Sequence, residues 1–311
     1  MKIHRRNIKY KYHRIGAGII VFIAALSLVL VNLPRAQASQ LNKKYSFIKT
    51  NYTVPTSNVA WVAPNGNDTS GNGSEGSPYA TFKKALSSIS NGGTVVAKSG
   101  IYRESHFFIS GDNVTIQAAP GAEVWLKGSD VVNSWTSENG IWKTTGNYHN
   151  FCHVCTTNVN PSVEGAAAYP EQVFINDEPL KQVKTKAEVT PGSNTFYVED
   201  NTPTTLKTPN NNADGYNIGQ QDAISYYIGK NPASGVTEIS ERARAFTSTG
   251  KNVSVKGINV AQYSPVQVWG FKDPYDPAAE RGVYSGPTAV SINGSGSLVQ
   301  DMIVTQSASQ G

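Results

Sequence analysis

The residues best suited to chemistry gather in one segment, residues 269–287, which reads WGFKDPYDPAAERGVYSGP. Sugars are held by aromatic faces and by charged groups that form hydrogen bonds, so this composition suits one wall of a glycan cleft. We predict four catalytic residues in the segment: Asp273, Asp276, Glu280 and Arg281. We predict three substrate-binding residues among them: Trp269, Tyr275 and Tyr284.

Two reactions could use such groups. Hydrolysis of a glycoside needs a carboxylic acid and a carboxylate about 5 to 9.5 Å apart. β-Elimination from a uronic acid needs a base such as Lys or Arg, together with a cation that neutralises the substrate carboxylate. A solvated loop whose charges pair with one another is a further interpretation of the same residues, because exposed ion pairs are common on protein surfaces.

The two cysteines, Cys152 and Cys155, form the motif Cys-His-Val-Cys, with His149 three residues before it. In an oxidising compartment we expect a short disulfide between them. A zinc site through His149 is an alternative, but an obvious fourth ligand is missing. A redox motif of the thioredoxin kind would need a following helix, and residues 147–161 are too rich in Asn, Thr and Pro for one. Reduced thiols are the remaining interpretation.

The loop PNGNDTSGNGSEGSP, residues 64–78, offers two ligand motifs. Residues 71–76 spell Gly-x-Gly-x-x-Gly, but the glycines do not open a helix directly after a strand, so we predict no nucleotide. Asp68, Glu75 and the Asn side chains could supply oxygens to calcium, which takes about six to eight of them. EF-hand spacing is absent, so a plain turn is favoured; calcium stays open as a cofactor, and we assign no metal ligand.

The net charge of +5 over 311 residues raises the question of a nucleic-acid partner. Seven of the 27 Lys and Arg residues lie in residues 1–38, which contain no Asp or Glu. Residues 39–311 therefore hold 20 basic against 22 acidic residues and are slightly acidic. A nucleic-acid-binding protein would carry its basic residues on the folded part of the chain, so we predict no nucleic-acid partner.

Residues 15–33 contain no charge, follow the basic start and precede Ala36-Gln37-Ala38. These are the three parts of a secretory signal, with cleavage after Ala38. The apolar run is long enough to span a bilayer instead, as an uncleaved anchor. In both interpretations the basic end stays in the cytoplasm, so we expect an extracellular or cell-surface protein that meets the membrane only through this segment.

Most of the exported chain is predicted to form short strands separated by turns. One amphipathic helix is expected at Tyr79–Ser90, with Ser77 as its N-cap and Pro78 at its first position. A strand precedes the helix at 58–63, and ten follow it: 94–97, 113–117, 124–126, 173–175, 195–198, 223–228, 252–255, 266–269, 289–292 and 302–304.

The last part of the chain matches itself at an offset of 44 residues, with Ala245 over Ala289 and Gly250 over Gly294. Such repetition is typical of solenoids, whose neighbouring coils cover one another's edges. Forty-four residues are two coils of about 22, or one coil with an inserted loop. The second option fits better, because residues 269–287 do not resemble a coil.

Several short motifs then carry a resemblance to a known family. They are WVAPNG at 61–66, the helix from Tyr79, GTVV at 93–96, GIYRE at 100–104 and NVTI at 113–116. In this order they resemble bacterial right-handed parallel β-helix proteins of the pectate-lyase-like superfamily. The resemblance is strong for residues 58–128 and good for residues 241–311. It implies an all-β solenoid with an N-terminal capping helix.

The export segment, a polar stretch after it and the resemblance together lead us to expect five parts: residues 1–38 as a signal peptide or anchor, 39–57 as a linker, 58–128 as the cap and first coils, 129–240 as an inserted β-rich lobe, and 241–311 as further coils. The register stops part-way through a coil, so we expect more coils beyond Gly311. The resemblance implies a polysaccharide partner, acted on by a lyase or glycoside hydrolase. A non-catalytic glycan-binding or adhesin-like surface protein is the alternative.

Overall fold

The computed structural model describes residues 45, 47–104, 106–148, 171–200, 209–210, 217–218, 224–264 and 288–307. The predicted export segment, with the apolar residues 15–33, lies outside these ranges, as do Cys152 and Cys155. Within the described ranges, no helix has both the length and the apolar character needed to cross a membrane.

One part of the chain, which we call the body, consists of three sheets in which every strand pair is parallel. Sheet 1 contains β1 (Val59–Val62), β2 (Thr94–Ala97), β5 (Thr115–Ala118), β19 (Ser254–Lys256) and β22 (Leu298–Gln300). Sheet 2 contains β3 (Gly100–Tyr102), β6 (Val124–Lys127), β20 (Ile258–Ala261) and β23 (Val304–Thr305). Sheet 3 contains β4 (Phe107–Ile109), β18 (Phe246–Ser248) and β21 (Val290–Ile292).

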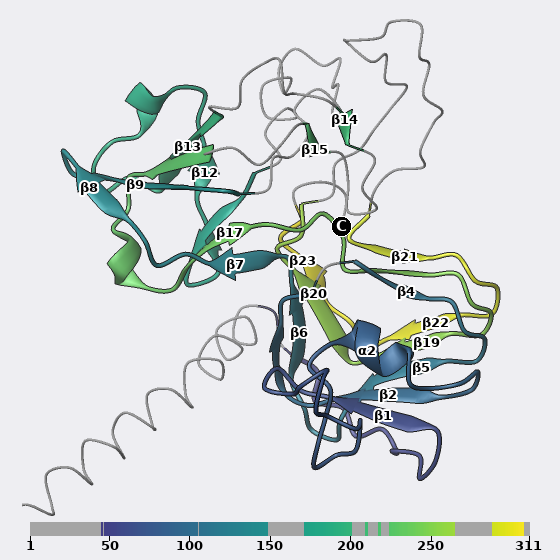
Figure 1. Ribbon diagram of the computed structural model, residues 1–311. Helices are drawn as coiled ribbons and strands as arrows, with labels where there is room; N and C mark the ends of the chain where they lie inside the picture. The colour runs from purple at the N-terminus through teal and green to yellow at the C-terminus, as the bar shows by residue number, and fades with distance from the viewer. Residues whose placement is uncertain are drawn as a thin grey trace, which may run out of the picture.

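The chain visits the three sheets in rotation, so that each passage lays one strand on each sheet (Figure 1). We call one passage a coil. Thr94 on β2 pairs with Thr115 on β5, so a coil here takes 21 residues. Phe246 pairs with Val290 and Val255 with Val299, which confirms the predicted offset of 44 as the register of a single coil with an insertion.

Aliphatic side chains stack from coil to coil inside the body. Val95, Ile116 and Val255 occupy one register position on β2, β5 and β19, and each is at most 1% exposed. Val299 continues the same position on β22 but is 42% exposed. The parallel sheets are therefore held by a continuous apolar interior, whose last described coil is open to solvent.

The single α-helix described is shorter than predicted and begins later. Helix α2 (Phe82–Leu86) has Thr81 as its N-cap, so the prediction of Ser77 and Pro78 as its start is wrong. Tyr79 instead runs alongside β1, because its N–H donates to the carbonyl of Trp61 and its carbonyl accepts from Ala63. Pairing with β1 keeps this stretch extended until Thr81.

The apolar side of α2 packs against the first coil. Phe82 is fully buried, and its ring lies 5.0 Å from the ring of Tyr102 and 5.4 Å from that of Phe107. Two carboxylates hold the start of the helix. Asp68 accepts from the N–H groups of residues 80 and 81, and Glu104 accepts from those of residues 82 and 83.

Between β6 and β18 the chain forms a separate lobe with its own core, seen in Figure 1 beside the ends of the sheet 2 strands. Its antiparallel sheet contains β11 (Glu178–Pro179), β10 (Val173–Ile175), β17 (Thr237–Ser240) and β7 (Ser129–Val131). Its larger sheet contains β12 (Lys181–Gln182), β13 (Thr195–Asp200), β16 (Ile224–Ile228), β9 (Ile141–Gly146) and β8 (Thr136–Glu138). The smaller elements are β14 (Pro209–Asn210), β15 (Asn217–Ile218), η1 (Lys186–Glu188) and η3 (Pro232–Ser234).

Mostly parallel β structure is thus confirmed. The predicted strands overlap observed ones at every position except 266–269, which lies outside the described residues. Predicted boundaries are wrong by up to two residues at some ends; the last predicted strand, 302–304, is observed at Val304–Thr305. Those ends are set by pairing with the neighbouring coil, which local sequence does not encode. The five predicted domain boundaries stay predictions.

The environment of Glu104 predicts a pH-dependent stability. Burial raises the pKa of Glu104 to about 7 from its usual 4.5, despite the two N–H donors of α2. The folded state therefore binds a proton more tightly than the unfolded state, so the free energy of unfolding should fall as pH rises from 4.5 to 7, by up to about 3 kcal/mol from this group.

Denaturant unfolding at several pH values measures how the free energy of unfolding depends on pH. Glu104→Gln should weaken this dependence between pH 4.5 and 7, because glutamine does not titrate. Glu75→Gln, at an exposed position of the preceding loop, is the matched control and should keep the wild-type slope. A wild-type and a Glu104→Gln curve that run parallel across this window would contradict the assignment.

Candidate functional site

The residues predicted to act in catalysis and substrate binding lie outside the described residues. They are Asp273, Asp276, Glu280, Arg281, Trp269, Tyr275 and Tyr284. The chain leads toward that segment from Ser264, whose N–H donates to the carbonyl of Arg242 at 2.9 Å. Arg242 therefore lies beside the last described residue before that segment.

Two strands at the junction of body and lobe, β7 and β17, present two different faces. They pair Ser129 with Ser240, Asp130 with Ile239, and Val131 with Glu238. The N–H of Glu241 donates to the carbonyl of Gly128 at 2.8 Å and extends this register by one pair. Because side chains alternate along a strand, Asp130 and Glu241 share one face, and Ser129 and Glu238 share the other.

A hollow of about 420 Å³ opens over the face that carries Asp130 and Glu241. Its polar lining includes Asp130, Asn133, Ser134, Thr144, Tyr148 and Glu241. Asp130 and Glu241 are diagonal neighbours, a relation that places Cα atoms roughly 7–8 Å apart. Glycoside hydrolases hold two carboxyl groups about 5 to 9.5 Å apart, and side chains on diagonal positions of one sheet face can reach such a separation.

Arg242 fixes the orientation of Asp130. Its Nη1 donates to Oδ1 of Asp130 at 2.9 Å, and its Nη2 donates to Oδ2 at 3.1 Å. The Asp130 side chain is 40% exposed, whereas that of Arg242 is 17% exposed. A two-point contact of this kind sets the plane of the carboxylate, so Asp130 presents a defined edge to the hollow.

Tyr148 contributes a hydroxyl to the lining of the hollow. Its Oη lies 2.7 Å from Oγ1 of Thr144, and its ring packs edge-on against Tyr226 at 5.1 Å. Burial raises the pKa of Tyr148, and the charge of Glu241 raises it further, while the contact with Thr144 opposes this. The hydroxyl therefore keeps its proton and can donate as well as accept, as recognition of sugar hydroxyls requires.

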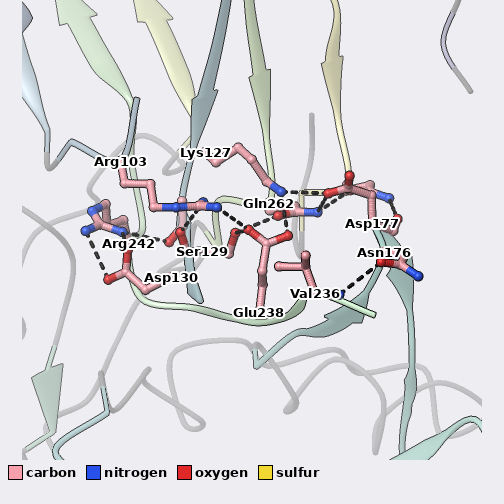
Figure 2. A network of polar contacts seen from close by, with 12 residues as sticks. Arg103, Lys127, Ser129, Asp130, Asn176, Asp177, Val236, Glu238, Arg242 and Gln262 are labelled. Atoms are coloured by element: carbon pink, nitrogen blue, oxygen red, sulfur yellow. Dashed lines mark hydrogen bonds and ion pairs between the residues drawn. The ribbon is translucent and has the colours of Figure 1, made fainter. Parts of the chain in front are cut away.

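The other face of β7 and β17 closes on a charged network (Figure 2). Lys127, the last residue of β6, is fully buried. Its Nζ lies 2.6 Å from Oδ1 of Asp177 and 2.6 Å from Oε2 of Glu238. Nη2 of Arg103 lies 2.6 Å from Oε1 of Glu238. Two cations and two carboxylates thus face one another.

Two glutamines tie the network to the neighbouring coils. Oγ of Ser129 donates to Oε1 of Gln262 at 2.5 Å. Nε2 of Gln262 donates to Oδ1 of Asp177 and to Oε1 of Gln306, each at 2.9 Å. Gln306 in turn donates to the backbone carbonyl of Asp177 at 2.6 Å. Residues of the body therefore bind the lobe at several points.

The two carboxylates of the network differ in their electrostatics. Burial raises the pKa of Asp177, and the attraction of Lys127 offsets this only in part. Burial acts on Glu238 as well, but Lys127 and Arg103 together hold the pKa of Glu238 below its usual range. The side chains of Lys127, Asp177 and Glu238 are at most 4% exposed, so this face has no room for a substrate.

In the part of the chain that the structure describes, no group of three or more His, Cys, Asp or Glu residues is arranged to hold a metal ion. In the loop considered for calcium, both carboxylate oxygens of Asp68 accept hydrogen bonds from residues 80 and 81.

The sequence analysis predicted neither the residues that line the hollow nor those of the charged network. Lys127 ends the strand Val124–Lys127, whose four residues are all buried, and a lysine in such a strand signals a buried partner. The partners Asp177 and Glu238 lie 50 and 111 residues away, so no local motif could identify them.

Comparisons with known proteins find similarity only among solved structures. No family model matches the chain, and no curated protein matches it. A solved structure described as "The complex structure of XylC with xylose" superposes with a TM-score of 0.51 at 19% identity, covering 66% of this chain and 35% of that one. Another, described as "Glycoside hydrolase", gives a TM-score of 0.40 at 13% identity, covering 67% of this chain and 51% of that one. The chain therefore spans about a third to a half of their lengths, and the first similarity shows a shared fold.

The junction depends on a glycine at the end of β6. A Cβ added at Gly128 would lie 2.5 Å from the carbonyl oxygen of Gln262 and 2.6 Å from Cα of Tyr263. Gly128→Ala should therefore push the two coils apart and lower the free energy of unfolding by about 1–3 kcal/mol, the usual cost of overpacking.

Gly76→Ala is the matched control for this substitution. A Cβ at Gly76 meets no atom within 4 Å, so the free energy of unfolding should stay within about 0.5 kcal/mol of wild type. Chemical denaturation of both variants measures the difference. Equal stability of the two variants would show that β6 and β20 do not approach this closely.

Proposed function

We propose that the protein is exported, is built on a right-handed parallel β-helix, and acts on polysaccharide at the junction hollow. The observation that carries the proposal is the pair of carboxylates, Asp130 and Glu241, on one face of β7 and β17, surrounded by hydroxyl and amide groups. Such a set of groups matches the hydroxyl-rich surface of a sugar.

The rotation of the chain through three parallel sheets supports the β-helix part of this proposal. Helix α2 would act as its N-terminal cap, because Phe82 buries its ring against the first coil. The xylose complex of the structural neighbour belongs to that protein, and it adds a reason to test pentose-containing glycans here. Export by residues 1–38, by cleavage or as an anchor, remains part of the proposal.

Among the two reactions, the hollow favours hydrolysis. The described residues that line it include two carboxylates but no Lys, Arg or His that could serve as the base of an elimination. Arg242, which contacts Asp130 beside the hollow, uses both terminal nitrogens on that carboxylate. A lyase would instead need a cation that is available to the uronic acid carboxylate.

The proposed roles follow from the surroundings of each carboxylate. Arg242 orients Asp130, which would act as the base or nucleophile. Glu241, the second carboxyl group of the hollow, would protonate the leaving oxygen. Asp273, Asp276, Glu280 and Arg281, with Trp269, Tyr275 and Tyr284, stay proposed as residues of a further wall of the cleft.

A non-catalytic surface protein that binds glycan is the second candidate. The same hollow favours it, because hydroxyl, amide and carboxylate groups hold a sugar without any proton transfer. The lobe would then act as a binding module carried by the β-helix. The two candidates differ in one observable, the release of new chain ends from a bound glycan.

Purified full-length protein should release reducing ends from a neutral xylose-containing glycan in a panel that also includes uronans. Asp130→Asn and Glu241→Gln should each lower kcat/KM about 10²- to 10⁴-fold, the usual contribution of general acid–base groups, with Kd changed much less. Glu138→Gln, at a lobe side chain that is 46% exposed, should match wild type.

Three results would redirect the proposal. Binding without new chain ends would support the surface-protein candidate and contradict the enzyme. Unsaturated ends from a uronan would show elimination instead of hydrolysis. Full activity in both carboxylate variants would place the reaction away from the hollow.

A further inference from the structure

The charged network on the dry face of β7 and β17 has no part in the proposed sugar chemistry. Lys127 is fully buried, and its Nζ is within 2.6 Å of carboxylate oxygens from two different lobe segments. A buried ion pair is expensive to desolvate, and replacing one by uncharged groups is often neutral or stabilising. The arrangement brings an amine, a carboxyl group and a second carboxylate into one dry space.

We propose that Lys127 and Asp177 join through an intramolecular amide bond, formed by the protein itself with Glu238 as the proton carrier. The bond links Nζ of Lys127 to Cγ of Asp177 and releases one water. It is independent of the sugar chemistry proposed above and would form whether or not the hollow is catalytic.

The atoms balance without any co-reactant. Glu238 takes one proton from the Lys127 ammonium and passes it to the Asp177 carboxylate. The amine lone pair attacks Cγ, forming the C–N bond and a tetrahedral carbon. Glu238 takes a second proton from the nitrogen and gives it to the hydroxyl on that carbon. The C–O bond then breaks, water leaves, and Glu238 ends as the carboxylate that it was at the start.

The surroundings of Asp177 favour each step. Burial raises the pKa of Asp177, so the carboxyl group accepts the proton that it needs before attack. Nε2 of Gln262 donates to Oδ1 of Asp177 at 2.9 Å and would stabilise the negative oxygen of the tetrahedral carbon. Holding amine and carboxyl in contact gives effective concentrations of about 10⁵–10⁸ M in well-oriented cases.

Charge balance is preserved after the reaction. Before it, Arg103 and Lys127 face Asp177 and Glu238, which is two charges of each sign. The amide removes one of each sign, and Arg103 stays paired with Glu238 at 2.6 Å. The buried space then contains one ion pair instead of two, which reduces the desolvation cost of the junction.

The backbone conformation of Asp177 is one that favours glycine, which indicates that the Asp177 side chain has a role at this position. Asn176 and Asp177 form the two-residue turn between β10 and β11, with φ values of 53° and 61°. A turn of this type favours glycine at its second position, because other residues are strained at positive φ. Asp177 occupies that position with its side chain 4% exposed and directed at Lys127 (Figure 2).

The mass of the intact chain tests the proposal directly. Purified wild-type protein, corrected for its observed N-terminus, should be lighter than its sequence mass by one water. Proteolysis should release one branched peptide that contains Lys127 and Asp177, with no tryptic cleavage after Lys127. A wild-type mass equal to the sequence mass would overturn the proposal.

Four variants separate this bond from other losses of water. Lys127→Arg keeps the charge but should show its full sequence mass. Glu238→Gln removes the proton carrier and should also show full mass, or acquire the loss at least tenfold more slowly. Asp177→Asn should lose one ammonia in place of water. Lys186→Arg, on the exposed surface of the lobe, should lose one water as wild type does.

The variants add two ways in which the proposal fails. A loss of water that persists in Lys127→Arg would arise elsewhere in the chain. A loss that is as fast and complete in Glu238→Gln as in wild type would remove Glu238 from the reaction. Since the first measurement uses only wild-type protein, misfolding of a variant does not affect the outcome.

Discussion

The burial of Lys127 is the constraint on which the junction depends. A lysine ammonium without water must be matched by carboxylates, and here it meets Asp177 from the β10–β11 turn and Glu238 from β17. Removing one partner of such a group typically costs about 3–5 kcal/mol, because the remaining charge stays buried. Body and lobe are therefore not independent: the last residue of β6 is stable inside the protein only when two lobe segments are in place.

The same constraint explains how a polar hollow can have a fixed shape. Strands β7 and β17 alternate, so the residues that close on Lys127 and those that line the hollow are neighbours along the same backbone. Glu238 cannot move without shifting Glu241, and Ser129 cannot move without shifting Asp130. The buried, charge-paired face of β7 and β17 thus holds the face that lines the hollow in position, as a preorganised site requires.

Much of the body could be predicted from sequence, whereas the site could not. Coils repeat with short, locally encoded motifs, so the offset of 44 and most strands followed from residues such as Gly250 and Val255. The predicted start of α2 was too early because the backbone of Tyr79 forms hydrogen bonds with β1. The local sequence pattern does not encode that pairing. Asp130 and Glu241 lie 111 residues apart and look like ordinary surface carboxylates until β7 and β17 pair.

The position of the lobe within the repeat explains why the junction is charged. The lobe interrupts the chain between sheet 2 and sheet 3, after β6 and before β18, so the coil that contains it must still pair with its neighbours on both sides. Gln262 and Gln306 sit at the matching turn of the next two coils and bind Asp177 from there. At this turn the carbonyl of Gln262 accepts from Oγ of Ser240, and the carbonyl of Gln306 accepts from Nε2 of Gln172. Apolar lobe residues at these positions would leave both carbonyls without these donors. The polar junction is thus a consequence of inserting a lobe into a stack whose turns continue beneath it.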